Sequence, residues 1–173
     1  MTQCSKLAAG AAFPGLVWPA VGGGTLDVAA MQGWRLLAVY RGKHCPLCKR
    51  YLKTLDGLHD EFRTAGVTVS AVSADPKEKA EADVAEQGWR FPVGYGLTIE
   101  HMCKLGLYVS DPRSPQETDR PFAEPGLFLV NPQGSAQIID VSNAPFARPD
   151  LQMILNGVKT IIEKSYPVRG THA

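Results

Sequence analysis

Two cysteines three positions apart are the residues of this sequence best suited to chemistry. Cys45 and Cys48 follow an apolar run at residues 34–40 and precede apolar residues at helical spacing. A cysteine at a helix start lies near unpaired backbone N–H groups and the positive end of the helix dipole, which favour an anion. Cys45 is therefore expected to have a lowered pKa and to be the reactive thiolate. Cys48 comes round one helical turn, near enough to close a disulfide. The motif predicts a redox site.

Alternating short strands and helices are expected to position this motif. Buried strands are predicted at 34–40, 67–73, 126–131 and 136–141, and two short extended pieces flank a glycine turn at 13–19 and 21–26. Helices are predicted from Cys48 to Phe62 with Gly66 as cap, from an Asp75-Pro76 opening to Gln87, over 98–105, and from near Pro149 to Ile162. One helical turn is predicted at residues 28–32, and a loop is predicted at residues 110–121.

Composition narrows the class of protein. The chain has 173 residues and a formal net charge of +1, which indicates neither a nucleic acid partner nor a membrane partner. Residues 1–15 do not have the pattern of a secretory signal, so the cytoplasm is the expected location. Four cysteines do not make a disulfide framework in a chain of this length, so the CxxC pair points to catalysis or metal. One domain over 1–173 is predicted, with a flexible tail at 1–11 in which Cys4 is incidental.

The order of elements is that of an α/β thioredoxin-like fold, with a central mixed β-sheet flanked by helices and an N-terminal β-hairpin extension. The chain resembles the peroxiredoxin-like branch of the alkyl hydroperoxide reductase/thiol-specific antioxidant (AhpC/TSA) family. The features that carry the resemblance are Phe13-Pro14, Tyr40-Arg41-Gly42, His44-Cys45-Pro46-Leu47-Cys48, the strand end at 69–75, Lys104-Leu105-Gly106-Leu107 and the segment 124–134.

This resemblance implies two chemistries, which the sequence does not separate. In a peroxiredoxin the Cys45 thiolate would reduce a hydroperoxide and become a sulfenic acid, and Cys48 would resolve it as an intramolecular disulfide. In a thioredoxin-like reductase, Cys45 would attack a protein disulfide and Cys48 would resolve the mixed disulfide. The expected partners are the hydroperoxide or protein disulfide, an external thiol reductant such as a thioredoxin-like protein, and a second copy in a homodimer. No cofactor and no metal are expected.

Further site residues also follow from the resemblance. Pro125 corresponds to the cis-proline that packs against the two sulfurs in thioredoxin-fold CxxC proteins. His44 precedes the first cysteine, and Pro46 lies inside the motif. Gly42 stands where peroxiredoxins have Thr or Ser, and Ala38 where they have Pro, so the peroxide-holding hydroxyl is missing. The nearest candidate for an arginine beside the thiolate is Arg120, with Arg113 or Arg41 as substitutes.

These residues also allow other interpretations. A non-catalytic thioredoxin-fold binding module would need neither cysteine to be reactive. A zinc site would need two ligands besides the CxxC pair, and His101 with Cys103 has poor ligand spacing on a helix. Cys103 itself is expected to be a buried apolar filler, with an alternative resolving role as the less favoured interpretation. Asp75 is expected to be a helix cap rather than a proton carrier.

Overall fold

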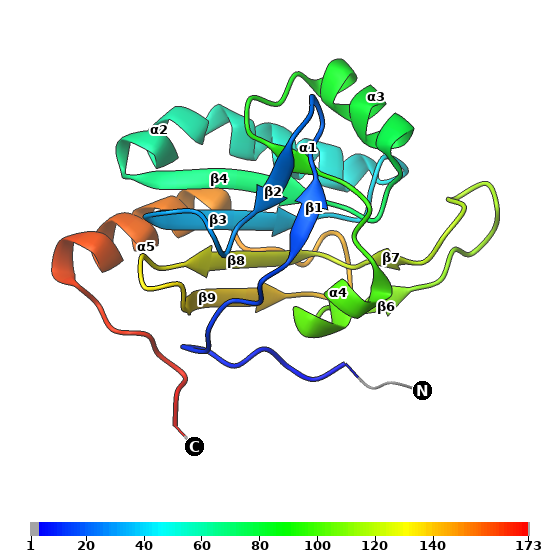
Figure 1. The fold of residues 1–173 in the computed structure, drawn as a ribbon. Helices are drawn as coiled ribbons and strands as arrows, with labels where there is room; N and C mark the ends of the chain where they lie inside the picture. Colours follow the sequence, from blue (N-terminus) through cyan, green and yellow to red (C-terminus); the bar gives the residue numbers. More distant parts are fainter. Residues whose placement is uncertain (1–3, 173) are drawn as a thin grey trace.

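A five-stranded mixed sheet forms the centre of the computed structural model, which describes residues 4–172 (Figure 1). Its order is β5 (Val93–Gly94), β4 (Val67–Val72), β3 (Trp34–Val39), β8 (Gly126–Val130) and β9 (Ala136–Val141). β3 pairs parallel to β4 and antiparallel to β8, and Val39 lies opposite Val72. β3 and β4 therefore end at the same edge of the sheet, and the loops that follow them come together there.

Helices cover one face of this sheet and the N-terminal hairpin covers much of the other (Figure 1). α1 (Pro46–Gly57), α2 (His59–Thr64), α3 (Lys77–Gln87) and α5 (Leu151–Lys164) contribute to one core cluster. β1 (Val17–Pro19), β2 (Thr25–Asp27) and α4 (Ile99–Lys104) contribute to the second cluster. A short ribbon of β6 (Val109–Ser110) and β7 (Phe122–Ala123) leads into β8. The predicted mixed sheet with flanking helices and an N-terminal hairpin is confirmed.

The burial of β3 on both faces explains why its sequence is almost entirely apolar. Leu36 and Ala38 lie in the cluster under α1 and α5, whereas Leu37 and Val39 lie in the cluster under the hairpin. Successive side chains of a strand point to opposite faces, so a strand covered on both faces needs apolar residues at every position. The strand ends at Val39, and the chain then turns towards the two cysteines.

Two helices expected from the sequence begin or continue differently. The helix expected over 48–62 is interrupted at Leu58, after Gly57, and becomes α1 and α2. Glycine has a low helix propensity, which favours a break at this point. Asp75 does not cap α3: the N-cap is Pro76, and the Asp75 carboxylate instead accepts a hydrogen bond from the Lys43 backbone N–H.

A buried arginine shapes the segment between β2 and β3, where one helical turn was expected. Residues 28–30 form a turn rather than a helix. Arg35 is 3% exposed, and its guanidinium donates hydrogen bonds to four backbone carbonyl oxygens, those of Val28, Ala29, Gly33 and Asn131. The carbonyl groups of Val28 and Ala29 accept hydrogen bonds from the guanidinium. The segment therefore forms a turn around the arginine side chain instead of a helix with hydrogen bonds of its own.

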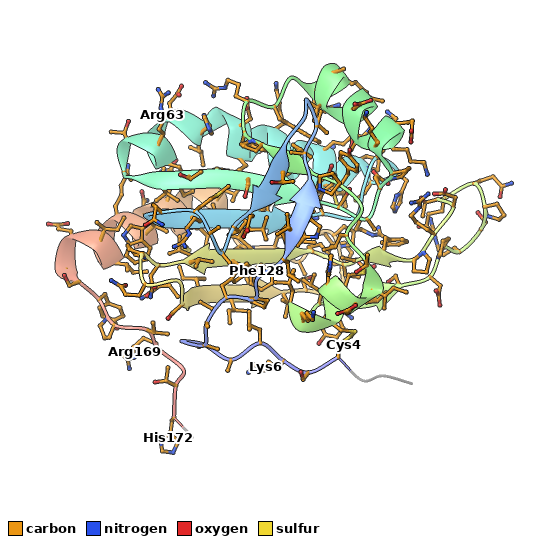
Figure 2. All side chains as sticks on the ribbon, viewed as in Figure 1. Cys4, Lys6, Arg63, Phe128, Arg169 and His172 are labelled. Atoms are coloured by element: carbon orange, nitrogen blue, oxygen red, sulfur yellow. A yellow bond between two sulfur atoms is a disulfide. The ribbon has the colours of Figure 1, made fainter. Side chains whose placement is uncertain are left out.

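The N-terminal segment differs most from its prediction as a flexible tail. Residues 1–3 of that prediction lie outside the described part of the chain. Cys4 forms a disulfide with Cys103 of α4, and the Gly10 backbone N–H donates to the Ala136 carbonyl at 2.8 Å. Figure 2 shows Cys4 beside α4, on the N-terminal coil. Neither cysteine therefore has the role expected for it. Within residues 4–172, no helix combines the length and apolar character needed to cross a membrane.

Candidate active site

Cys45 lies at the N-cap position of α1, as its place in the motif predicted. Its backbone is extended, with φ −109° and ψ 100°, and Pro46 occupies the first helical position, where a missing N–H costs nothing. The Cys48 backbone N–H donates to the Cys45 Sγ at 3.3 Å. The thiolate thus takes the position that a Ser or Asp oxygen occupies in other helix caps.

The surroundings of Cys45 favour its thiolate form. The pKa of Cys45 is lowered to about 6, first by the hydrogen bond from the Cys48 thiol, then by the Cys48 backbone N–H and the charges of Arg41 and Arg148, while burial opposes the shift. An unperturbed cysteine has a pKa of about 8.5. Most of Cys45 is consequently ionised at neutral pH, which is the state needed for a nucleophile.

Cys48 has the opposite character. Its side chain is completely buried, and burial, followed by its hydrogen bond with Cys45, raises its pKa. One guanidinium nitrogen of Arg148 donates to the Cys48 Sγ at 2.8 Å. The Arg148 guanidinium also lies 4.7 Å from the centre of the Tyr51 ring, one helical turn after Cys48. The pair therefore consists of one thiolate and one thiol that is protonated at neutral pH.

Gly42 and Asp75 meet where the loops after β3 and β4 converge. Gly42 has a φ of +126°, and a Cβ added to it would lie 2.7 Å and 2.8 Å from the two Asp75 carboxylate oxygens. Asp75 is 2% exposed, and burial raises the pKa of its carboxyl group, while the hydrogen bond from the Lys43 N–H opposes that shift. A Thr or Ser at position 42 would have to displace this carboxylate, so the missing hydroxyl reflects the packing of this chain.

A cavity of about 520 Å³ opens beside Cys45 and is lined by His44, Pro46, Arg41 and Glu117 among others. The His44 ring contacts the Phe122 ring edge-to-face at 4.7 Å, and both its nitrogens are buried without a hydrogen-bond partner. Burial lowers the pKa of His44, and Arg41 adds to this effect. His44 therefore lines the cavity as a neutral side chain. Cys45 is 3% exposed, so a substrate must reach it through this opening.

Pro125 and Arg120 do not have the arrangement expected of them. The peptide bond before Pro125 is trans, as are all peptide bonds of the described residues, so the cis-proline prediction is wrong. The flanking backbone is held extended: the Glu124 N–H donates to the Tyr108 carbonyl, and the Pro125 carbonyl accepts from Ser142. Arg120 is paired with Asp119 at 2.8 Å, so its charge is engaged away from the thiolate.

The two arginines whose charges act on Cys45 are Arg41 and Arg148. Arg41, one of the substitutes proposed from the sequence, lies 3.4 Å from a Glu124 carboxylate oxygen and 3.7 Å from a Glu117 one. The other substitute, Arg113, is largely exposed and paired with Glu117. Arg148 was missed, because it contacts Cys48 across 100 residues of sequence and has no local pattern that marks it.

Two further groups bear on the zinc interpretation. Cys103 is joined to Cys4, and the Nδ1 atom of His101 accepts a hydrogen bond from the Trp18 indole at 3.0 Å. The only additional ligands that the sequence offered are thus engaged elsewhere. Among residues 4–172, no group of three or more His, Cys, Asp and Glu side chains is arranged to hold a metal ion.

One curated protein has a stretch of sequence similar to this chain. The chain is 28% identical over 89 residues to the thiol-disulfide oxidoreductase ResA of Halalkalibacterium halodurans; the alignment covers 51% of this chain and 47% of ResA. The chain thus spans about half the length of that curated relative.

Solved structures of peroxiredoxins share the fold. A cysteine-to-serine mutant of peroxiredoxin 6 from Arenicola marina has a TM-score of 0.75 at 22% identity, covering 92% of this chain and 75% of that one. The peroxiredoxin-like protein from Aquifex aeolicus has a TM-score of 0.77 at 16% identity, covering 91% and 89%. AhpC of Mycobacterium tuberculosis has a TM-score of 0.74 at 16% identity, covering 93% and 96%. These similarities confirm the predicted thioredoxin-like fold.

A match between this sequence and a family pattern shows which family the chain belongs to. Residues 9–138 match the pattern that defines the AhpC/TSA family, and this stretch contains the N-terminal hairpin, both cysteines of the CxxC motif and the central strands of the sheet. The resemblance noted from short motifs therefore extends over most of the chain, and the protein belongs to the AhpC/TSA family.

Proposed function

We propose that this protein is a thiol-dependent oxidoreductase that reduces hydroperoxides through Cys45, with Cys48 as the resolving thiol. The observation that carries the proposal is the Cys45 sulfur at the N-cap of α1. There it accepts the Cys48 N–H, has a pKa lowered to about 6 and borders an open cavity. Membership of the AhpC/TSA family supports the same chemistry.

The reaction follows from the two sulfurs. The Cys45 thiolate attacks the terminal oxygen of the hydroperoxide, the O–O bond breaks, and the alcohol leaves after taking a proton. Cys45 is now a sulfenic acid. Cys48 loses its proton and attacks the Cys45 sulfur, water leaves, and the disulfide forms. An external dithiol, such as a thioredoxin-like protein, then returns both sulfurs to the reduced state. Because both cysteines lie on the first turn of α1, the disulfide can form without unfolding that helix.

A second candidate, reduction of protein disulfides, is favoured by the contact between Gly42 and Asp75. Peroxide reduction benefits from donors that stabilise the developing charge on oxygen. Position 42 supplies no hydroxyl, and the buried Asp75 carboxylate leaves no room for a side chain there. In this alternative the same Cys45 thiolate attacks a substrate disulfide and Cys48 releases the product. The curated relative ResA carries the name of that activity.

Stopped-flow mixing of the reduced protein with hydrogen peroxide or with a protein disulfide such as insulin separates these candidates. The fluorescence of Trp89, which shares a core cluster with both cysteines, is the reporter. A peroxidase gives a fast phase with peroxide that disappears in Cys45→Ser, and Cys48→Ser accumulates a sulfenic acid that dimedone traps. The double substitution Cys4→Ser/Cys103→Ser, which removes the two cysteines outside the motif without leaving an unpaired thiol, is the matched control.

A peroxide rate no greater than that of a free thiol refutes the first candidate, and rapid reduction of insulin then establishes the second. Slow reaction with both substrates leaves the non-catalytic binding module as the remaining function.

The homodimer and the cytoplasmic location are still predictions. The Cys4–Cys103 disulfide weighs against the latter, because persistent disulfides are rare in reducing compartments.

A further inference from the structure

We propose that Arg148 is a catalytic residue of the reductive half-reaction, in which it stabilises the Cys48 sulfur as the leaving thiolate. This inference rests on the proposed function, in which Cys45 and Cys48 alternate between a disulfide and a dithiol. Arg148 donates its hydrogen bond to the second cysteine of the motif, not to the first.

The guanidinium of Arg148 is directed at the interior of the protein. One nitrogen lies 2.8 Å from the Cys48 Sγ, while the other terminal nitrogen is buried without a hydrogen-bond partner among the described residues. Within residues 4–172, Arg148 forms no ion pair with a carboxylate, unlike Arg41, Arg90, Arg113 and Arg120. Its positive charge is therefore free to act on sulfur.

Two contacts hold the guanidinium in this position. It lies over the Tyr51 ring, 4.7 Å from the ring centre, and the Tyr51 hydroxyl donates to the Pro149 carbonyl at 2.9 Å. Tyr51 follows Cys48 by three residues on α1, so both face the segment before α5. α1 thus carries the sulfur and the aromatic platform together, and the neighbouring residue Pro149 is tied to that platform.

Reduction of the disulfide places new charge on Cys48. A thiolate of an external dithiol attacks the Cys45 Sγ, the Cys45–Cys48 bond breaks, and its electron pair moves to the Cys48 Sγ. Cys48 leaves as a thiolate and then takes up a proton. The second thiolate of the donor attacks the donor sulfur bound to Cys45, releases the Cys45 thiolate and leaves the donor oxidised. Two electrons pass from the donor to the cysteine pair.

Among the described residues, the Arg148 guanidinium contributes most to stabilising the leaving sulfur, and a backbone hydrogen bond from Arg41 contributes less. Cys48 is 0% exposed, so water does not solvate the new thiolate. An uncompensated charge in such a position is costly, whereas a charge-assisted hydrogen bond from a guanidinium is among the strongest available in proteins. Oxidation begins at Cys45, where the Cys48 N–H and Arg41 also act. Arg148 is therefore expected to matter more for reduction than for oxidation.

The test measures both half-reactions in Arg148→Gln, with Arg50→Gln as the matched control because Arg50 lies exposed on the same helix. Reduction of the oxidised protein by dithiothreitol should slow by about tenfold to a hundredfold in Arg148→Gln. Arg148→Lys should recover part of that loss, and the reaction of Cys45 with peroxide should slow less. Arg50→Gln should match the wild type. Equal slowing of both half-reactions, or reduction within about twofold of the wild type, overturns the proposal.

A titration that needs no substrate separates this inference from the proposed function. In a Cys45→Ala background, the ultraviolet absorbance of the Cys48 thiolate reports its pKa, which should rise when Arg148→Gln is added. An unchanged pKa refutes the role of Arg148 even if the protein is an active peroxidase. A raised pKa in a protein that reduces neither peroxide nor disulfides supports the contact and refutes the proposed function. If Arg148→Gln does not fold, Arg148→Met keeps the stem over Tyr51 and serves in both measurements.

Discussion

The substitution Gly42→Ala tests why this chain has no side chain at the position where peroxiredoxins have Thr or Ser. It adds one methyl group and no new polar atom. The added Cβ would lie 2.7 Å, 2.8 Å and 2.9 Å from the Oδ1, Oδ2 and Cγ atoms of Asp75. Those atoms cannot retreat easily, because the carboxylate is buried and accepts the Lys43 N–H at 2.7 Å.

Two separate costs determine the expected loss of stability. A residue with a Cβ held at a φ of +126° costs about 1–3 kcal/mol in backbone strain. Forcing an extra methyl group against packed atoms costs a further ~1–3 kcal/mol. Together the free energy of unfolding should fall by about 2–6 kcal/mol, a large share of the ~5–15 kcal/mol that a typical domain possesses.

Urea unfolding measures this loss, and substitutions at two other glycines separate the cost of backbone strain from the cost of packing. Gly134, with φ +81° and open space around it, carries only the backbone cost, so Gly134→Ala should lose about 1–3 kcal/mol. Gly57 at the end of α1 has neither a positive φ nor a neighbour within reach of a Cβ, and Gly57→Ala should be neutral or stabilising by up to ~1 kcal/mol.

A double-mutant cycle isolates the contact with Asp75. Asp75→Ala removes the atoms that the new methyl group meets, so Gly42→Ala should cost only its backbone strain in that background. The coupling free energy is expected to be about 1–3 kcal/mol. If Gly42→Ala costs no more than Gly134→Ala, or if the two substitutions are additive, the close approach of Asp75 does not explain the glycine and the reasoning is refuted.

Three further predictions concern other parts of the molecule. Alkylation of Cys45 by iodoacetamide should speed up as pH rises, reach half its plateau near pH 6 and level off above it, because the thiolate is the reactive form; a midpoint near that of a free thiol contradicts this. Cys4→Ser should lower the free energy of unfolding by up to ~4–5 kcal/mol, since the lost disulfide closes a loop of 99 residues, and reductant should abolish the difference from the wild type. Arg35→Met should cost about 3–5 kcal/mol in urea unfolding, because four carbonyls lose their donor; a cost below ~1 kcal/mol shows that water replaces the guanidinium.

Local sequence determined the reactive motif and most of the elements around it. The helix-start position of Cys45, the one-turn spacing to Cys48 and the apolar strands depend on neighbours within a few residues, which periodicity and capping rules describe. The strand expected at 67–73, the end of α3 at Gly88 and the start of α5 near Pro149 were all confirmed within one or two residues. The turn at 28–30 was missed because its partner, Arg35, acts from the following strand.

Tertiary structure alone decided what surrounds the two sulfurs. Asp75 reaches Gly42 because β3 and β4 are parallel and end at the same edge of the sheet. Arg148 reaches Cys48, and Cys4 reaches Cys103, over about one hundred residues in each case. Such contacts depend on strand order and on how the last helix and the N-terminal segment pack, and no spacing rule within a few residues encodes them. The sequence therefore predicts which cysteine is the thiolate, whereas the fold determines the charges and packing around the pair.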